Sequence, residues 1–328
     1  MNPREVVMGV FRKARAFWEA RILMTAAELD IFSAIADRPK TAKELAAERG
    51  YDARATEYLL NAVAAMGLLD KKDGAFRVRP GLERFLSNST PETVIPLILH
   101  MAHMWDNWGT LTEIVKEGKH EKERPEWEEA GLKAFIGAMH TIGRGLADSV
   151  VAKLDLSGRK KLLDVGGGSG VYTIAMLKRA PEMRATIFDR KPVLEIARQK
   201  VAEEGLSERV EFAPGDFYKH PLPGGHDIAL LSAIIHQNSH QQNIDLYRKV
   251  HDALVPGGEI VIRDHVMSED HTQSAEGAFF AINMLINTPG GGTYSFGEIK
   301  EGLEAAGFRD VTLVHKAEMD SLVTGVKK

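Results

Sequence analysis

The chain is organised around the stretch Lys160-Lys161-Leu162-Leu163-Asp164-Val165-Gly166-Gly167-Gly168-Ser169-Gly170. A short apolar run of the kind found in buried parallel strands leads here into a glycine-rich turn. The next residues, 171–179, predict a helix that ends before Pro181. A strand, a glycine turn and a helix in this order offer backbone N–H groups to a ligand at the carboxyl edge of an open α/β sheet.

The spacing of the glycines distinguishes between two kinds of nucleotide site. A dinucleotide-binding turn needs a third glycine three residues after Gly168, and Val171 occupies that position. The glycines fall instead at 166, 168 and 170, behind Asp164. This spacing with a leading acid resembles the first motif of S-adenosylmethionine (SAM)-dependent methyltransferases. The structural alternative is a glycine turn that only lets a helix pack closely on a strand.

Composition narrows the class of protein. The 328 residues are enough for two domains, and the formal net charge of −4 gives no attraction to nucleic acid or to an anionic membrane. The absence of cysteine excludes disulfides, thiolate metal sites and cysteine nucleophiles, and it fits a reducing cytoplasm. No signal core follows Met1 to Glu5, and no apolar run is long enough to span a bilayer.

The first 95 residues predict a winged helix. Thr41 and Glu44 form a capping box, Asp52 caps the following helix, and Asp73-Gly74 predicts a tight hairpin. Such a domain either binds DNA or mediates dimerisation. The helix that would enter a DNA groove, 52–66, is mostly alanine and leucine, which argues against DNA binding.

An aromatic stripe near the N-terminus favours dimerisation. It comprises Phe11, Phe17, Trp18 and Ile22 at helical spacing, which is more apolar surface than a small domain can bury. We therefore expect a homodimer that binds neither nucleic acid nor membrane.

The remainder predicts a helical connector at 96–150 and a Rossmann-like, doubly wound α/β domain at 151–328. A charge run at 121–126 is expected to be a linker, a loop followed by a helix is expected over 90–114, and a long helix is expected over 130–154. Strands and helices then alternate, which is typical of a mostly parallel sheet. The strands are expected at 160–165, 186–189, 210–216, 228–235, 259–264, 311–314 and 322–326.

Acidic residues end two of these strands beside the glycine turn. Asp189 lies about 20 residues beyond the turn, where a carboxylate accepts the hydroxyls of a nucleoside ribose. Asp216 and Phe217 end the next strand and are suited to hold an adenine. For either acid alone, a surface or capping role is the alternative.

His236 follows the fourth expected strand, and Asp264 ends the fifth. Because neighbouring parallel strands open into one crevice, the pair predicts a general base with an orienting acid. His140 and His265 are the next candidate bases. A zinc site at His236 and His240 is the rival interpretation, but Gln237 replaces the glutamate of the zincin motif, so we expect no metal.

Nearly the whole chain resembles the small-molecule O-methyltransferases that join an N-terminal winged-helix dimerisation domain to a Rossmann-like SAM domain. This family includes plant caffeic acid and phenolic enzymes and bacterial tailoring enzymes. Residues 163–170 are similar to its first motif, Phe188-Asp189 to its ribose-binding acid, Gly215-Asp216-Phe217 to its adenine-side motif, and 254–258 to the turn before its fifth strand.

The resemblance implies SAM as cofactor and a small aromatic hydroxyl compound as acceptor. The implied cofactor residues are Asp164, Gly166, Gly168, Asp189, Arg190, Asp216, Phe217 and Ser232, with Arg144 added from its place on the helix before the turn. The implied substrate-pocket residues are Trp105, Trp108, Phe135, Met139, His140 and Met284.

Two departures from the family pattern concern the base. The family reads His-Asp-Trp where this chain reads His236-Gln237-Asn238, and its glutamate beside the histidine aligns with Thr293. Asp264 aligns with the family's other acid, one carbon shorter. A family member that binds SAM but decarboxylates, hydroxylates or cyclises its substrate is therefore an alternative, and a SAM-sensing DNA-binding regulator is another.

Overall fold

The computed structural model describes residues 2–88, 90, 92–118 and 129–328. The chain divides into two compact units, Met1–Trp105 and Asp106–Lys328. The charge run expected at 121–126 lies outside the described residues. The three-part division expected from the sequence stays a prediction, and the long helix before the glycine turn belongs to the second unit.

The first unit has the helices and the hairpin expected of a winged helix. The capping box at Thr41 and Glu44 is formed, and Asp52 accepts a hydrogen bond from the N–H of Ala55. Asp73 and Gly74 turn the hairpin with φ of 49° and 78°, the signs of a type I′ turn. Its elements are α1 (Pro3–Arg15), α2 (Phe17–Glu28), α3 (Ile31–Ala34), β1 (Lys40–Thr41), α4 (Ala42–Arg49), α5 (Ala53–Ala65), β2 (Leu69–Lys72), β3 (Ala75–Val78), α6 (Glu83–Leu86) and α7 (Ile95–His103).

The aromatic stripe lies on a surface that its own unit leaves open. All of α1 is described, and none of its residues is buried. The side chains of Phe11, Phe17 and Trp18 are each more than half exposed, at 55%, 53% and 53%. The core of this unit lies elsewhere, around Phe32, Leu60 and their neighbours.

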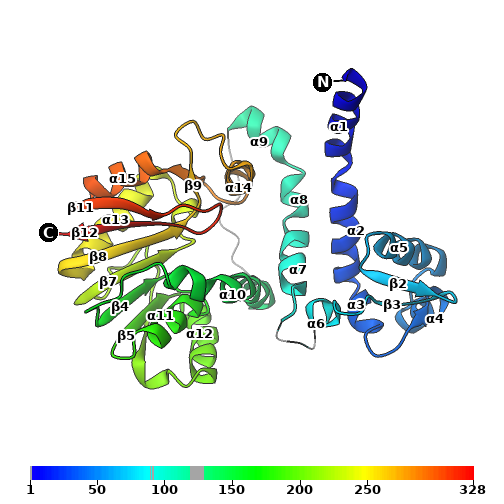
Figure 1. The fold of residues 1–328 in the computed structure, drawn as a ribbon, viewed down its shortest axis with the longest axis horizontal. Coiled ribbons are helices and arrows are strands. Elements are labelled where there is room, and N and C mark those ends of the chain that lie inside the picture. Colours follow the sequence, from blue (N-terminus) through cyan, green and yellow to red (C-terminus); the bar gives the residue numbers. More distant parts are fainter. Residues whose placement is uncertain (1, 89, 91, 119–128) are drawn as a thin grey trace. The chain divides into compact units, whose positions relative to one another are not determined.

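The second unit is a doubly wound α/β domain, as the sequence predicts (Figure 1). The strand order is β11-β12-β8-β7-β4-β5-β6. Strands β8 to β6 in this order are parallel, and β12 is antiparallel to both of its neighbours. The strands are β4 (Lys161–Val165), β5 (Arg184–Asp189), β6 (Val210–Pro214), β7 (His226–Ser232), β8 (Leu254–Asp264), β9 (Val266–Met267), β10 (Tyr294–Ser295), β11 (Phe308–His315) and β12 (Ser321–Lys327).

Helices cover both faces of this sheet with separate apolar cores. One core joins the sheet to α10, α11 and α12, and the other joins it to α13 and α15. All strands between β6 and β8 point the same way, so their carboxyl ends meet at one edge. The helices of the unit are α8 (Trp105–Trp108, across the boundary), α9 (Leu111–Glu117), α10 (Glu129–Val151), α11 (Val171–Arg179), α12 (Lys191–Glu203), α13 (His240–Ala253), α14 (Ala275–Asn287) and α15 (Phe296–Ala305).

Two sequence expectations about elements are wrong. The fourth strand was expected to continue to Ile235, but β7 ends at Ser232 because Ala233 adopts a φ of 57°, and Ile235–Gln237 forms a 3₁₀ turn. The helix expected within 90–114 is broken into α7, α8 and α9. Apolar composition alone does not reveal either break.

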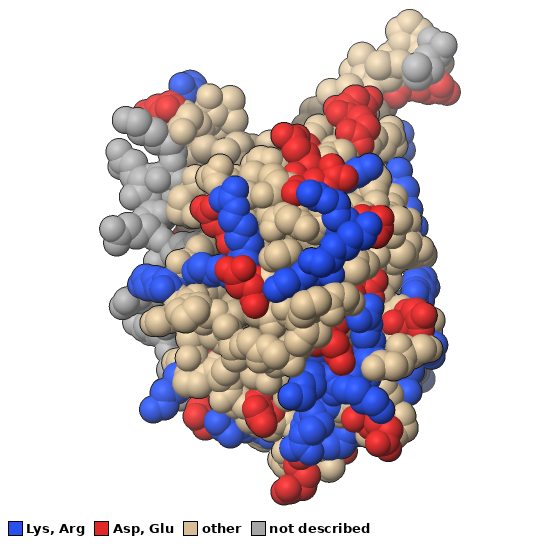
Figure 2. Space-filling view, turned by 90° about the vertical axis from the view of Figure 1, so that its left-hand side faces the viewer, with Lys and Arg blue, Asp and Glu red and all other residues tan. Residues whose placement is uncertain are grey.

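Charge is mixed on the face drawn in Figure 2. Lysine and arginine side chains are interspersed there with aspartate and glutamate, and several basic side chains adjoin one another at the lower centre of the view. Among the described residues, no helix combines the length and the apolar character needed to cross a bilayer.

Candidate active site

The glycine turn between β4 and α11 is tightly packed. Gly166, Gly168 and Gly170 have φ of 69°, 57° and 77°, a region that side chains rarely adopt. A Cβ on Gly166 would lie 2.5 Å from Ile234 Cδ1 and 3.5 Å from the Phe217 ring. The same position on Gly168 meets no atom within 4 Å, so the turn is open toward a ligand there.

Asp164 lies beneath this turn. Its side chain is buried, accepts a hydrogen bond from Thr173 Oγ1 at 2.6 Å, and packs against Gly167. Burial raises the pKa of the Asp164 carboxyl to about 7, and the charge of Asp189 adds to the rise while the Thr173 bond opposes it. Its contacts support the turn from below, and its role in cofactor binding stays a prediction.

Asp189 faces the turn from the end of β5. Oδ2 accepts from the N–H of Gly168 at 2.9 Å, and Oδ1 accepts from the N–H of Arg190 at 2.7 Å. Burial raises the pKa of this carboxyl, and the two backbone bonds oppose the rise. Each oxygen keeps a further acceptor position, which is what a pair of ribose hydroxyls requires.

The other expected cofactor residues differ in their burial and in their distance along the chain from the glycine turn. Phe217 is half-buried beside Gly166, and Asp216 Oδ1 accepts from the N–H of Tyr218 at 2.9 Å. Ser232 ends β7 beside Arg263 of β8. Arg190 and Arg144 are exposed. Asp189 and Phe217 thus both lie against the glycine turn, and contacts of all these residues with a cofactor stay predictions.

The structure brings His236 and Asp264 together. His236 Nδ1 lies 2.8 Å and 3.0 Å from the two carboxylate oxygens of Asp264. Asp264 is buried, and its Oδ1 also accepts from the N–H of His265 at 2.9 Å. Burial opposes the charge, but His236 and His265 together hold the pKa of the Asp264 carboxyl below its ordinary value. The carboxylate therefore stays ionised beside the imidazole.

Asn238 stands where the family has tryptophan. It is fully buried and forms hydrogen bonds with three other side chains. Its side-chain oxygen accepts from the Tyr218 hydroxyl, and its Nδ2 donates to Asn243 Oδ1 at 3.0 Å. Its backbone oxygen accepts from the Tyr294 hydroxyl. Asn243 in turn donates to the carbonyl of Ile235 at 2.9 Å. This departure therefore fixes the loop that carries His236 instead of leaving it loose.

The glycine segment after α14 closes over the same loop. Gly292 N–H donates to the carbonyl of His236 at 2.8 Å, and a Cβ on Gly291 would lie 2.4 Å from that oxygen. Thr293 is buried and donates to the carbonyl of Gly277 at 3.3 Å. The position aligned with the family's glutamate thus supplies no carboxylate to the imidazole.

The expected pocket residues of the second unit lie on three helices, α8, α10 and α14. His140 Nδ1 is 2.9 Å from Ser169 Oγ, so α10 is tied to the glycine turn, and its neighbours Phe135 and Met139 are half-buried. Burial lowers the pKa of His140, and Lys200 and Arg144 lower it further. Trp108 Nε1 donates to Asn283 Oδ1 of α14 at 3.1 Å, beside the buried Met284.

Trp105 falls at the end of the first unit, where its ring lies 6.5 Å from that of Phe17. Its place in the substrate pocket stays a prediction. Among the described residues, no cluster of three or more His, Cys, Asp or Glu side chains has the arrangement of a metal site. His240 begins α13, and the preceding Ser239 forms a capping box with Gln242.

Phe280 was not identified from the sequence. Its ring contacts both His236 and His265, at centroid distances of 4.8 Å and 4.5 Å. The signal that could have identified it is its helical spacing from Met284, which lies one turn further along α14. The side-chain partners of Asn238 carried no such signal, because Tyr218, Asn243 and Tyr294 come from three separate segments.

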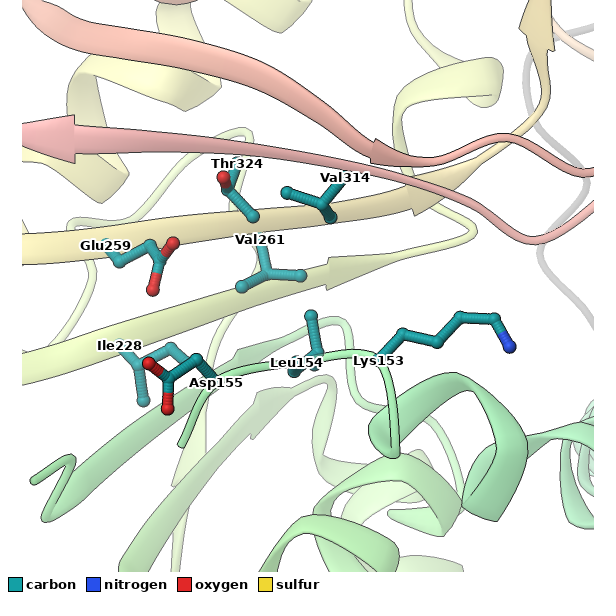
Figure 3. Close-up of a pocket in the computed structure, with 8 residues that line it drawn as sticks. All are labelled: Lys153, Leu154, Asp155, Ile228, Glu259, Val261, Val314 and Thr324. Carbon is teal, nitrogen blue, oxygen red and sulfur yellow. The ribbon is translucent and has the colours of Figure 1, made fainter. Parts of the chain in front are cut away.

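A separate pocket of about 150 Å³ lies on the sheet away from these residues (Figure 3). Its lining includes Ile228, Glu259, Val261 and Thr324. Glu259 lies five residues before Asp264 on β8, roughly 17 Å along an extended strand. The pocket is therefore distinct from the edge that carries the glycine turn and His236.

Comparison with known proteins gives the family. Residues 108–309 match the O-methyltransferase domain, and residues 11–89 match the O-methyltransferase dimerisation domain. A 3-hydroxy-5-methyl-1-naphthoate 3-O-methyltransferase of Streptomyces sahachiroi is 31% identical over 323 residues, 96% of this chain and 93% of that one. Acetylserotonin O-methyltransferase of Gallus gallus is 27% identical, over 97% of this chain and 96% of that one.

Solved structures agree with this. An O-methyltransferase family protein of Burkholderia thailandensis superposes with a TM-score of 0.86 at 25% identity, and 98% of each chain is covered. The structure of PigF with S-adenosylhomocysteine (SAH) superposes with a TM-score of 0.89 at 25% identity over the whole of both chains. The chain therefore belongs to the family of SAM-dependent O-methyltransferases, with the dimerisation domain that accompanies it.

Proposed function

We propose that this enzyme transfers a methyl group from SAM to a phenolic or enolic hydroxyl of a small aromatic molecule, with His236 as general base. The observation that carries the proposal is the hydrogen-bonded pair of His236 and Asp264 at the same sheet edge as the glycine turn. Backbone N–H groups for a nucleoside and a base for an acceptor proton lie at neighbouring strand ends.

The residues present fit the cofactor. Gly166 and Gly168 allow a close backbone approach, Asp189 has acceptor positions for ribose hydroxyls, and Phe217 offers a ring beside Gly166. SAM supplies a methyl group already activated on a sulfonium. The protein then has to position the acceptor, which contributes up to ~7–11 kcal/mol in favourable cases, and to remove one proton.

The tautomer of His236 suits that task. An ionised carboxylate only accepts hydrogen bonds, so Nδ1 carries the hydrogen that faces Asp264 and Nε2 keeps a lone pair. Nε2 takes the acceptor proton as its oxygen attacks, and the buried charge of Asp264 stabilises the imidazolium. A general base placed in this way contributes about 10²–10⁴ to the rate.

The acceptor class rests on the relatives and on the side chains near the base. The Streptomyces sahachiroi relative is named for a hydroxynaphthoate and the Gallus gallus relative for acetylserotonin, both aromatic. The helix α14, whose Phe280 contacts the His236 ring, also carries the buried Met284, and its Asn283 accepts a hydrogen bond from Trp108 of α8. We infer that the acceptor is a fused-ring hydroxyl compound, and that the enzyme acts as a homodimer in the cytoplasm.

The test combines a substrate panel with one variant. The purified dimer is incubated with SAM and 3-hydroxy-1-naphthoate, N-acetylserotonin, or 1-naphthoate as the matched compound without a hydroxyl. We expect SAH and a methylated product from a hydroxylated compound only. His236→Ala should lower methyl transfer by about 10²–10⁴ while SAM affinity stays near wild type. A product that lacks carbon dioxide or gains oxygen without a methyl group would overturn the proposal, as would a fully active His236→Ala.

A further inference from the structure

The ring of Phe280 lies between two histidines. It meets the His236 ring nearly at right angles, with centroids 4.8 Å apart and planes at 84°. It stacks on the His265 ring, with centroids 4.5 Å apart and planes at 29°. Perpendicular and stacked contacts of this kind are the favoured geometries of aromatic pairs.

His265 is a fixed support for this arrangement. Its Nδ1–H donates to the carbonyl of Glu318 at 2.9 Å, and its backbone N–H donates to Asp264. The side chain is buried, and burial lowers the pKa of the His265 imidazole even though the charge of Asp264 opposes this. The hydrogen bond and the burial anchor the His265 ring, and the Phe280 ring stacks on it.

The contacts of His236 leave one degree of freedom to this ring. Asp264 holds a single nitrogen, so the imidazole can rock about the line from Nδ1 to the carboxylate. Thr293 bonds to the carbonyl of Gly277 and supplies no second carboxylate to stop the rocking. The ring of Phe280 blocks this rocking. It lies perpendicular to the imidazole and is stacked on His265, so a tilted imidazole would collide with it.

We propose that Phe280 is a positioning residue that fixes the plane of the His236 imidazole, so that Nε2 points at the acceptor hydroxyl. The proposal rests on the proposed function, because it assigns Phe280 to the base of that reaction. A misplacement of about 1 Å at a reacting group costs about 10²-fold in rate. The role of Phe280 is therefore separate from binding either substrate.

The test uses a matched pair on one helix. Phe280→Leu removes the ring, Phe280→Tyr keeps it, and Phe279→Leu is the control, since the adjacent Phe279 is 68% exposed. With 3-hydroxy-1-naphthoate, Phe280→Leu should lower kcat about 10- to 100-fold. KM and the calorimetric Kd for SAH should stay within about twofold, a change of at most ~0.4 kcal/mol. Phe280→Tyr and Phe279→Leu should stay close to wild type.

A second measurement does not depend on turnover. Long-range ¹H–¹⁵N spectra of the imidazoles report the tautomer of His236, whose signal is identified by its loss in His236→Gln. We expect the Nδ1–H tautomer in all three proteins, because Asp264 still accepts from Nδ1. The ring signals of His236 should be sharp in wild type and Phe279→Leu and broadened by exchange in Phe280→Leu, because the plane of the imidazole is free to rock there.

Three outcomes overturn the role of Phe280. They are His236 ring signals in Phe280→Leu that are as sharp as in wild type, a kcat equal to that of Phe279→Leu, and a parallel loss of SAH affinity. If wild type methylates no compound, the proposed function fails, and the width of the His236 ring signals alone decides the role of Phe280.

Discussion

Replacing Asp264 with asparagine removes the charge that orients His236 and keeps the shape of the side chain. In the wild type both carboxylate oxygens accept from Nδ1, and Oδ1 also accepts from the N–H of His265. An amide has one acceptor oxygen and one donor nitrogen. The N–H of His265 keeps the amide oxygen at the Oδ1 position, so the amide nitrogen takes the Oδ2 position, 3.0 Å from Nδ1. Its hydrogen there favours an imidazole that carries its own hydrogen on Nε2.

The expected loss follows from that exchange. An imidazole with hydrogen on Nε2 cannot accept a proton there, so the general-base contribution of ~10²–10⁴ disappears. This corresponds to about 3–5 kcal/mol of activation free energy. The same substitution in the serine-protease triad produces the wrong tautomer and lowers kcat by about 10⁴. SAM affinity should not change, because the glycine turn and Asp189 lie on other strands.

The assay measures single-turnover SAH formation, product mass and calorimetric SAM affinity for Asp264→Asn. Asp252→Asn is the control, since that side chain is 86% exposed on α13. Part of the loss should return above pH ~10, where a phenol ionises without a base. If Asp264→Asn keeps more than about a tenth of wild-type activity at neutral pH, the general-base assignment is refuted, because a tenfold loss is less than this base contributes.

Three further predictions concern the cofactor site, stability and assembly. Asp189→Asn should weaken SAM binding at least tenfold, because charge-assisted hydrogen bonds contribute ~1.5–3 kcal/mol each, and unchanged calorimetric affinity would contradict the ribose assignment. Burial raises the pKa of Asp164 to about 7, so the folded state keeps a proton that the unfolded chain loses above pH ~4. Unfolding free energy from urea titrations should therefore fall as pH rises from ~4 to ~7, and Asp164→Asn should flatten that slope, whereas an equal slope in the variant would exclude Asp164 as its cause. Trp18→Glu puts a charge on the exposed apolar face of α2 and should yield monomers in light scattering at micromolar concentration; dimers that persist would indicate an interface elsewhere.

Local sequence chemistry was sufficient for much of the fold. The glycine turn, the capping box at Thr41 and the hairpin at Asp73-Gly74 depend on residues next to one another, and the structure has all of them. The meeting of His236 with Asp264 was predictable for a different reason. Both follow neighbouring parallel strands, and topology alone brings such positions to one edge.

The rest depends on packing that no local pattern encodes. Ile234 and Ile235 are as apolar as the strand before them, yet the φ of Ala233 turns the chain away after Ser232. Asn238 looked like a lost tryptophan, and only the positions of its distant tyrosine and asparagine partners reveal a satisfied buried junction. Phe280 contacts His236 and His265 only because α14 packs near the end of β8, and the sequence of α14 does not show this.

The antiparallel insertion of β12 has a consequence for synthesis of the protein on the ribosome. Within the sheet, β11 pairs with β12 and not with β8, although β11 is made first. It therefore leaves the ribosome with no strand to pair with, while β8 keeps an open edge that can associate with other chains. Arrival of β12 covers the open edge of β8, gives β11 its partner and sets Ser321 beside Asp264. The strand that ends in Asp264 thus gains its second neighbour only when the last strand of the sheet is added.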